Sequence, residues 1–470
     1  MIFQESLNSG FIPEDWRKGV IVPIYKRNGK PTEVASYRPI SLTSVVSKLL
    51  ERILHTYMEQ YLLSNSLICR NQHGFLKRKA TATNLLECMN DWTKSVDNKC
   101  PVDAIYVDLA KAFDSVSHPK LMFKLKEIGF GGGVLEWLRS FLCSRVQCVR
   151  VQNFLSPYEP VLSGVGQGTI LGPLIFLVYV NEVMTVPLSN SCLKLYADDA
   201  KLYGEAKSIP EAREIQSDLD KVSTYFNDWQ LNVNVDKCEV LHLGYGNPNF
   251  QYVISNADLP QVSFCRDLGI LISNDFNSLK HCTQISRNAY FKLKQFQMCF
   301  SCSDVNFQVF VFKTYIRPLL EYNTHIWSPH LIRDINTVEN VQRRFTKFLP
   351  GMRNRPYTAR LERLELESLE VRRIRYDLIF FYKMVNGVMD VDVSEFVSFN
   401  TNNTRGHAFK VNSMFSRLNC RKYFFVNRTI NLWNSLPANI AESESLAIFK
   451  NKIVTYDLTA YCRGRAHTAV

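Results

Sequence analysis

Apolar and polar positions along the chain follow two rhythms, and the balance between them changes near residue 276. Before that point, short apolar runs such as those at 19–27, 102–108 and 193–204 predict strands, and segments with helical spacing lie between them. After it, the apolar positions recur almost entirely at helical spacing. Strands and helices alternate without a regular strand–helix–strand order, which favours an α+β fold over a doubly wound parallel sheet.

Several individual elements follow from this pattern. Residues 45–54 have apolar positions at helical spacing and open a long amphipathic helix, and a second helix is expected from residue 81. The apolar run at 170–180 predicts a buried helix, since it is too short to span a bilayer and contains a Gly-Pro pair. Two basic amphipathic helices are expected near 335–348 and 367–387, the second stopping at Gly387. The polar stretch 391–412 predicts a linker.

Composition narrows the functional classes. The 470 residues carry a net charge of +12 and are 46% hydrophobic, as expected of a globular protein with a polyanionic partner such as nucleic acid. The cysteine count of 13 is odd and has no disulfide framework, and the N-terminus lacks the layout of a signal peptide. We therefore expect an intracellular protein of the nucleus or cytoplasm, neither secreted nor bound to a membrane.

Three acidic residues are the candidates for chemistry. Asp198 and Asp199 stand side by side at the tip of a predicted hairpin, and Asp108 ends the predicted strand before them. Adjacent buried carboxylates repel each other and lose solvation, so a bound divalent cation gives them a better reason than stability does. Magnesium prefers such oxygen ligands, and two ions can clamp a phosphoryl displacement. We expect Asp198 to be the bridging ligand beside Asp108 and Asp199 to be peripheral, because neighbours in a strand point to opposite faces. Taken alone, the acids are better explained as ordinary turn residues, because acidic residues are common in turns.

Other stretches, in order along the chain, favour the metal site over ordinary turn residues. "YVDLAKAFDSV", "SGVGQGTILGPL", "YADD", "WQLNVNVDKCEVLHLG" and "DLGILIS" follow one another, preceded by "GFIPEDWRKGVIVPIYKRNGKPTEVASYRPISL" and "NQHGFLKRKATATNLL". Together with "YIRPLLEYNTHIWSPH" and the C-terminal "LNCRKYFFVNRTINLWNSLP", this set resembles the reverse transcriptases of non-LTR, LINE-type retrotransposons of the CR1 and jockey kind.

The resemblance implies a right-hand polymerase with an antiparallel palm sheet. Its parts are fingers at 1–100, a palm at 101–275, a helical thumb-like region at 276–390 and a C-terminal module at 391–470. The fingers are expected to lack their first segment. The resemblance further implies RNA-directed DNA synthesis from deoxynucleoside triphosphates on an RNA template and a DNA primer. Two Mg²⁺ ions, or Mn²⁺ as a substitute, are implied at Asp108, Asp198 and Asp199.

The same resemblance implies a nucleotide-binding set. Lys26 and Arg38 match triphosphate contacts, where an arginine fork pairs phosphate oxygens well. Phe113 matches an aromatic residue that excludes a ribose 2′-hydroxyl, and Gln167 matches a residue packed against the nucleotide. Lys237 matches a family lysine of uncertain role, and Asp114 is expected to be structural.

Two departures from the family pattern bear on activity. Gly166 stands where the family has proline, which predicts a less preorganised nucleotide pocket. No segment resembles the endonuclease that such elements usually carry, so a nick would have to be supplied separately. The alternative is a catalytically inactive nucleic-acid-binding remnant of a truncated element. An RNA-dependent RNA polymerase is a further alternative, against which Phe113 argues.

The basic helices fit a surface that grips duplex phosphates. Six residues are candidates, with a solvated helix face as an equally good interpretation: Arg343, Arg344, Lys347, Arg372, Arg373 and Arg375.

Overall fold

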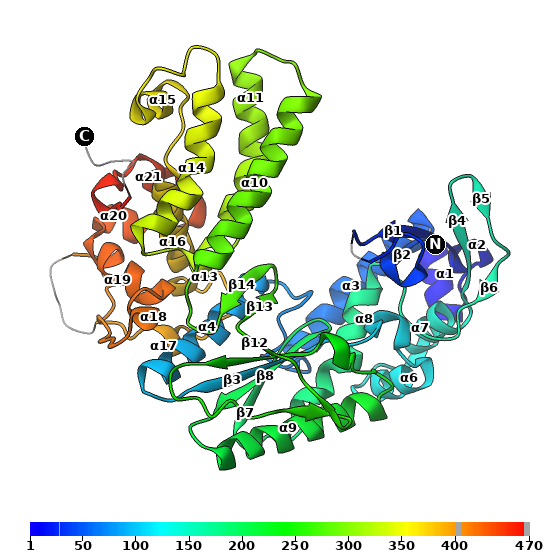
Figure 1. Cartoon of the computed structure of the whole chain (residues 1–470). Helices are drawn as coiled ribbons and strands as arrows, with labels where there is room; N and C mark the ends of the chain where they lie inside the picture. The colour runs from blue at the N-terminus through cyan, green and yellow to red at the C-terminus, as the bar shows by residue number, and fades with distance from the viewer. Residues whose placement is uncertain (28, 401–405, 465–470) are drawn as a thin grey trace. The chain divides into compact units, whose positions relative to one another are not determined.

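The computed structural model describes residues 1–27, 29–400 and 406–464. These residues form two compact units that interleave along the chain. Unit 1 comprises residues 1–80, 103–240 and 248–261, and unit 2 comprises residues 81–102, 241–247 and 262–470. Both sheets and helices are present, which confirms the α+β class (Figure 1). The four predicted regions remain a prediction.

Two five-stranded sheets and the two-stranded sheet β10–β11 are formed mainly by residues of unit 1. In the first, β1 pairs with β2 antiparallel and with β4 parallel, and β5 and β6 each pair with β4. The second has the order β12-β9-β3-β8-β7, with β7 and β8 forming an antiparallel hairpin. The strands are β1 Lys18–Tyr25, β2 Tyr37–Leu42, β3 Val102–Val107, β4 Val146–Val151, β5 Phe154–Leu155, β6 Glu159–Pro160, β7 Ser191–Tyr196, β8 Asp199–Glu205, β9 Glu239–Leu243, β10 Val253–Ile254, β11 Ala257–Asp258 and β12 Gln261–Val262.

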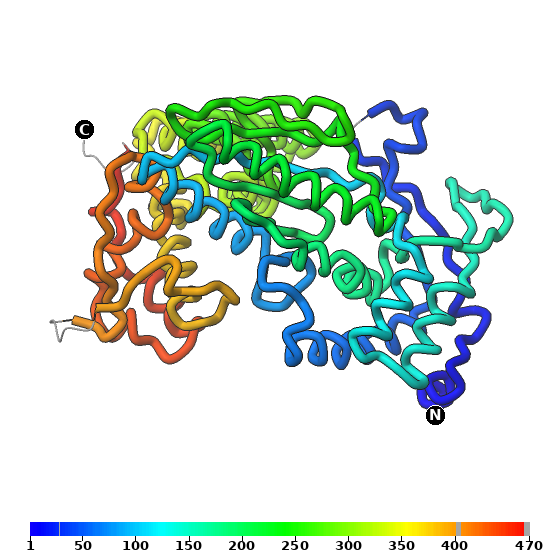
Figure 2. Tube along the Cα trace, turned by 90° about the horizontal axis from the view of Figure 1, so that it is seen from below, coloured from blue at the N-terminus to red at the C-terminus, as the bar shows by residue number. Residues whose placement is uncertain are grey.

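The helices of unit 1 pack around these sheets. Helix α8 is buried along its whole length and contacts α3 and α6, while α9 packs against β8. The N-terminal helix α1 lies beside α7, as Figure 2 shows in blue and cyan. The α-helices are α1 Ile2–Ser9, α2 Glu14–Arg17, α3 Val45–Ser64, α5 Ala112–Ser115, α6 His118–Glu127, α7 Gly132–Cys143, α8 Leu171–Val180 and α9 Ile209–Asp228, with 3-10 turns at Val34–Ser36, Asn181–Thr185 and Val235–Lys237.

Unit 2 is mostly helical, as expected. Helices α10 and α14 pack together, and α16 contacts α13, α14, α19 and α21 (Figure 1). A short hairpin, β13 Phe264–Asp267 with β14 Ile270–Ser273, precedes them. The helices are α4 Thr81–Asp97, α10 Leu279–Cys299, α11 Val305–Val311, α12 Arg317–Glu321, α13 Thr324–Trp327, α14 Ile332–Phe348, α15 Tyr357–Arg363, α16 Leu369–Val385, α17 Val393–Phe396, α18 Asn419–Lys422, α19 Phe425–Ser435, α20 Ala438–Ala441 and α21 Leu446–Thr455, with a π-turn at Phe312–Ile316 and a 3-10 turn at Thr459–Tyr461.

The predicted helices at 45–54, 81–97 and 170–180 are confirmed, and α16 ends just before Gly387, whose φ of 61° suits a helix stop. The predicted linker at 391–412 contains α17 and a bridge between Phe399 and Val411, and its residues 401–405 lie outside the described part of the chain. Among the residues that the structure describes, none of the helices combines the length and the apolar character that crossing a bilayer requires.

Candidate active site

Asp108 follows β3, whose residues are nearly all buried, and emerges where that strand ends. Its main chain pairs with the segment before the 3-10 turn Val235–Lys237, since the backbone N–H of Asn234 donates to the Asp108 carbonyl at 2.8 Å. The carboxylate oxygen Oδ2 accepts from Asn234 Nδ2 at 3.2 Å and from Lys237 Nζ at 3.3 Å. The Asp108 side chain is 33% exposed, so it is anchored on one side and accessible on the other.

The acid pair lies at the tip of the β7–β8 hairpin. Tyr196 pairs with Asp199, and Ala197 and Asp198 form the two-residue turn between them. Ala197 has a φ of +57°, a left-handed conformation that L-residues other than glycine seldom adopt. Asp198 is half-buried in the turn, whereas Asp199 is exposed at the start of β8. The two acids therefore differ in environment because one belongs to the turn, and strand alternation is the wrong reason for the difference.

Electrostatics link this turn to Asp108. Burial raises the pKa of Asp198, the negative charge of Asp108 raises it further, and the positive charge of Arg38 opposes the shift. Two carboxylates and one guanidinium from three separate stretches of sequence are thus close enough to affect one another. Two carboxylates that repel each other in this way favour a bound cation, which relieves the repulsion.

Gln167 and Lys26 both interact with a further acid, Asp114. Gln167 Nε2 donates to Asp114 Oδ1 at 3.2 Å. Burial raises the pKa of Asp114, while the bond from Gln167 and the charges of Lys111 and Lys26 lower it. Lys26 Nζ also donates to the carbonyl of Ala35 at 2.9 Å. Asp114 thus orients Gln167, a role consistent with the structural part expected for it.

Phe113 is half-buried in α5 and sits in an aromatic stack. Its ring lies parallel to that of Phe176, with centroids 4.3 Å apart, and meets Phe75 edge-on at 6.1 Å. The sequence suggested either core packing or a role at the nucleotide sugar for this ring. The stack provides core packing and leaves part of the ring accessible for a role at the nucleotide sugar.

The glycine-rich loop before α8 is fixed to its surroundings. Ser41 in β2 donates its N–H to the Gln167 carbonyl at 2.7 Å, and Glu51 accepts the N–H of Ile170 at 2.7 Å. Gly168 has a φ of +108°, and a Cβ there would come within 2.8 Å of the Ser41 carbonyl oxygen. Thr169 Oγ1 donates to the carbonyl of Gly166 at 2.8 Å. These bonds brace the loop, although the effect of Gly166 on preorganisation stays a prediction.

The donor set suits a hard divalent cation, to which phosphate oxygens or water would also be ligands. Asp108 and Asp198 supply carboxylate oxygens, and magnesium is commonly held by one or two carboxylates plus substrate phosphates. Within the described residues, no three His, Cys, Asp or Glu side chains converge closely enough to hold a metal by themselves. The structure places Asp198 where the charge of Asp108 acts on it, and Asp199 is exposed at the start of β8.

Sequence reasoning missed two polar residues of this region. Asn234 binds the Asp108 carboxylate, and Gln72 is hydrogen-bonded to the backbone of Ala197. Both lie more than a hundred residues from their partners, so nothing local in the sequence indicated either contact. Lys237 was singled out without a role, and the structure places its ammonium on Asp108.

The basic residues of unit 2 separate into two groups. Arg372 and Arg375 pair with Glu321 and Glu367, and Arg373 is 2% exposed. Arg373 and Arg375 are buried in α16, so the interpretation as phosphate-gripping residues is wrong for these two, whereas Arg372 is half-buried and its role stays a prediction. On α14, Arg343 is half-buried over the ring of Tyr357, whereas two other candidates are exposed, Arg344 and Lys347.

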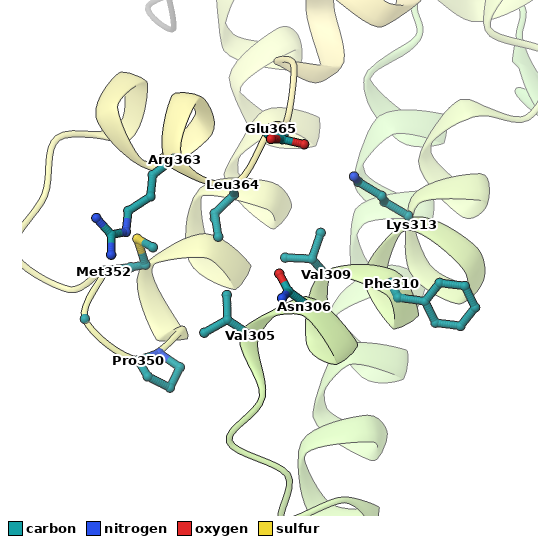
Figure 3. Close-up of a pocket in the computed structure, with 11 residues that line it drawn as sticks. Val305, Asn306, Val309, Phe310, Lys313, Pro350, Met352, Arg363, Leu364 and Glu365 are labelled. Carbon is teal, nitrogen blue, oxygen red and sulfur yellow. The ribbon is translucent and has the colours of Figure 1, made fainter.

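A cavity of about 490 Å³ lies in unit 2, between α11 and the chain around α15 (Figure 3). Its walls mix apolar side chains, such as Val305, Val309 and Leu364, with polar and charged ones, and Glu365 is its one carboxylate. None of the expected site residues lines it.

Comparison with known proteins places the chain. The family model "Reverse transcriptase (RNA-dependent DNA polymerase)" matches residues 24–272, more than half of the chain. The RNA-directed DNA polymerase from mobile element jockey of Drosophila melanogaster is 26% identical over 75% of this chain, and the probable RNA-directed DNA polymerase from transposon BS of the same organism is 28% identical over 73%. The chain spans 39% of the length of each.

Among solved structures, telomerase from Candida albicans in complex with a fragment of telomeric RNA aligns over 76% of this chain and 68% of its own, with 12% identity and a TM-score of 0.42. That likeness is too distant to support an argument about details. The match of the family model includes Lys26, Arg38, Asp108, Gln167 and the acid pair in one continuous span, and it agrees with the expected polymerase fold class. The chain belongs to the reverse transcriptase family.

Proposed function

We propose that this chain is an RNA-directed DNA polymerase of a LINE-type retroelement, which extends a DNA primer on an RNA template. The observation that supports this most is the convergence in unit 1 of Asp108 and Asp198 with Arg38. Polymerisation needs negative charge to hold cations and positive charge to hold a triphosphate, and three distant segments supply both at one place.

We assign the nucleotide to the residues around that pair. Arg38 and Lys26 bind the triphosphate oxygens, and Gln167, oriented by Asp114, packs against the nucleoside. Phe113, backed by Phe176, limits the space at the 2′ position of the sugar. Asp199 is an exposed, peripheral acid of the same site.

Asp108 and Asp198 would hold the divalent cation, with Mg²⁺ as the physiological ion, two ions in the working complex, and Mn²⁺ as a substitute. Such ions lower the pKa of the attacking 3′-hydroxyl and offset charge on the departing pyrophosphate. Lys237 and Asn234 keep the Asp108 carboxylate oriented from its far side. The RNA template, the DNA primer and deoxynucleoside triphosphates are the proposed partners.

The test is primer extension on poly(rA)/oligo(dT) with dTTP and Mg²⁺, comparing the wild-type chain with Asp198→Ala. Extension by the wild type that is lost in the variant would support the proposal. A folded wild-type protein that binds the duplex but adds no nucleotide would instead support the inactive remnant. An RNA polymerase would reveal itself by extending an RNA primer with UTP more efficiently.

A further inference from the structure

The segment Asn71–Phe75, between α3 and α4, runs beside the acid hairpin. Its main chain makes a short parallel pairing with β7: the N–H of Leu195 donates to the Asn71 carbonyl at 3.0 Å, and the N–H of His73 donates to the Leu195 carbonyl at 2.9 Å. This segment, hereafter the clamp segment, is thereby fixed at the level of the turn that carries Asp198.

The side chain of Gln72 reaches the turn itself. It is fully buried, and its Oε1 accepts from the backbone N–H of Ala197 at 2.9 Å and from that of Gly74 at 2.7 Å. Its Nε2 lies 3.5 Å from the Ala197 carbonyl oxygen. One amide therefore engages both polar groups of the residue immediately before Asp198.

Ala197 needs such support because its backbone is in the left-handed region. A non-glycine residue persists there when surrounding contacts fix it, and positions of this kind cluster at functional sites. The peptide orientation at Ala197 decides where the Asp198 carboxylate lies relative to Asp108.

The rest of the clamp segment reinforces the contact. A Cβ on Gly74 would lie 2.4 Å from the Ala197 nitrogen, so only glycine permits this approach. Phe75, with a φ of +55°, meets the ring of Phe113 edge-on. One five-residue segment thus contacts both the acid turn and the aromatic residue assigned to the nucleotide sugar.

We propose that Gln72 is a positioning residue: its amide fixes the left-handed turn at Ala197 and so sets the Asp198 carboxylate for joint cation binding with Asp108. The relevance of this role to DNA synthesis rests on the proposed function, whereas the effect on cation binding does not. Gln72 contacts no substrate in this scheme.

The main experiment replaces Gln72 by methionine, which has similar length and volume but cannot bond to Ala197. Mn²⁺ serves as the probe, and its binding to the full chain is measured from the electron paramagnetic resonance signal of the free ion. We expect binding 10- to 100-fold weaker than in the wild type, the usual cost of losing a group that orients metal ligands. Primer extension should show a lower kcat and a raised Mn²⁺ requirement, with duplex affinity unchanged.

Gln342→Met in unit 2 is the matched control. Gln342 is also fully buried and its Nε2 donates to the Glu367 carbonyl at 2.8 Å, so this variant loses comparable internal bonds. It should lose thermal stability without any change in Mn²⁺ affinity. Equal Mn²⁺ binding by Gln72→Met and the wild type would overturn the proposal.

A second variant tests the same proposal in case Gln72→Met does not fold. Gly74→Ala pushes against the Ala197 backbone while leaving Gln72 intact, and Gly131→Ala, with no atom within 4 Å of the new Cβ, is its control. Weaker Mn²⁺ binding in Gly74→Ala alone supports the clamp, and unchanged binding in a folded Gly74→Ala contradicts it. If the wild type binds Mn²⁺ but extends no primer, the proposed function fails while this comparison still decides the role of Gln72.

Discussion

At the scale of single residues, the Asp198 carboxylate serves the proposed cation binding but destabilises the folded protein when no cation is bound. Burial and the charge of Asp108 raise its pKa, so the folded state holds the proton more tightly than the unfolded chain. The stability cost of ionising Asp198 is therefore fully present above the raised folded pKa and fades as the pH falls toward the ordinary value of 3.8. Without divalent ions, Asp198→Asn should raise the melting temperature at pH 7 by a few degrees and abolish primer extension.

The wild type and Asp198→Asn also test the direction in which stability changes with pH. Melting curves in EDTA from pH 7 down to pH 4 should show the advantage of Asp198→Asn shrinking as the pH falls toward 3.8. Saturating Mn²⁺ should reverse the order, because only the wild type gains binding energy from the ion. A variant that is less stable than the wild type in EDTA at pH 7 would show that the carboxylate is not strained in the free protein.

Phe113 carries the second prediction at this scale. Replacing its ring by the smaller side chain of valine opens space at the proposed 2′ position, so Phe113→Val should increase ribonucleotide incorporation relative to deoxynucleotide about 10- to 100-fold. The measurement is kcat/KM for dTTP and UTP on the same primer. Phe176→Leu removes the stacked partner at 4.3 Å but keeps the Phe113 ring, and should shift the ratio far less. Equal shifts in both variants would assign the effect to lost packing.

At the scale of elements, the loop from Ser163 to Ile170 depends on its contact with β2. Gly168→Ala introduces a Cβ 2.8 Å from the Ser41 carbonyl oxygen and strains a φ of +108°. We expect a loss of about 1–3 kcal/mol in unfolding free energy. The KM for the nucleotide should rise as well, because Gln167 moves with the loop. Thermal melts and steady-state kinetics check this, with Gly131→Ala as the neutral substitution; a change in stability alone would separate the loop from nucleotide binding.

The elements also show what sequence could predict and where it stopped. The β7–β8 hairpin, α3 and α8 were predictable because their apolar spacing is local, and the chemistry of Asp108 and Asp198 was indicated by motif. The local pattern did not reveal that Asp198 follows a left-handed residue, Ala197, since the hydrogen bonds of Ala197 come from Gln72, 125 residues earlier in the chain. Likewise, the paired arginines of α16 read as basic surface because their partners, Glu321 and Glu367, were not identifiable from helical spacing.

At the scale of the whole molecule, most of the net charge of +12 belongs to unit 2. Its cations do two physically different things. Exposed residues such as Arg344 and Lys347 on α14 can attract a polyanion at long range. Salt weakens this attraction because it screens the charges. Arg428 instead pairs with both oxygens of the buried Asp377, at 2.8 and 2.9 Å, and stabilises the fold.

This division yields a prediction that separates binding from folding. Arg344→Ala with Lys347→Ala should weaken binding to an RNA–DNA duplex, and each lost phosphate contact should reduce the slope of log affinity against log salt by roughly 0.7–0.9. The melting temperature should hardly change, because exposed charges contribute little to stability. Arg139→Ala combined with Lys126→Ala, at exposed positions of α7 and α6, is the control that removes the same two positive charges.

Arg428→Leu should behave in the opposite way. It leaves Asp377 buried without its partner, and burial already raises the pKa of that carboxyl against the opposing charge of Arg428, so we expect a loss of about 3–5 kcal/mol. Below its lowered melting temperature, the variant should keep the wild-type salt slope, since a guanidinium engaged with Asp377 gains nothing from a phosphate. If Arg428→Leu reduced the slope and the α14 double variant did not, the duplex would be held by the residues that the structure places in the interior, and the assignment of the two groups would have to be exchanged.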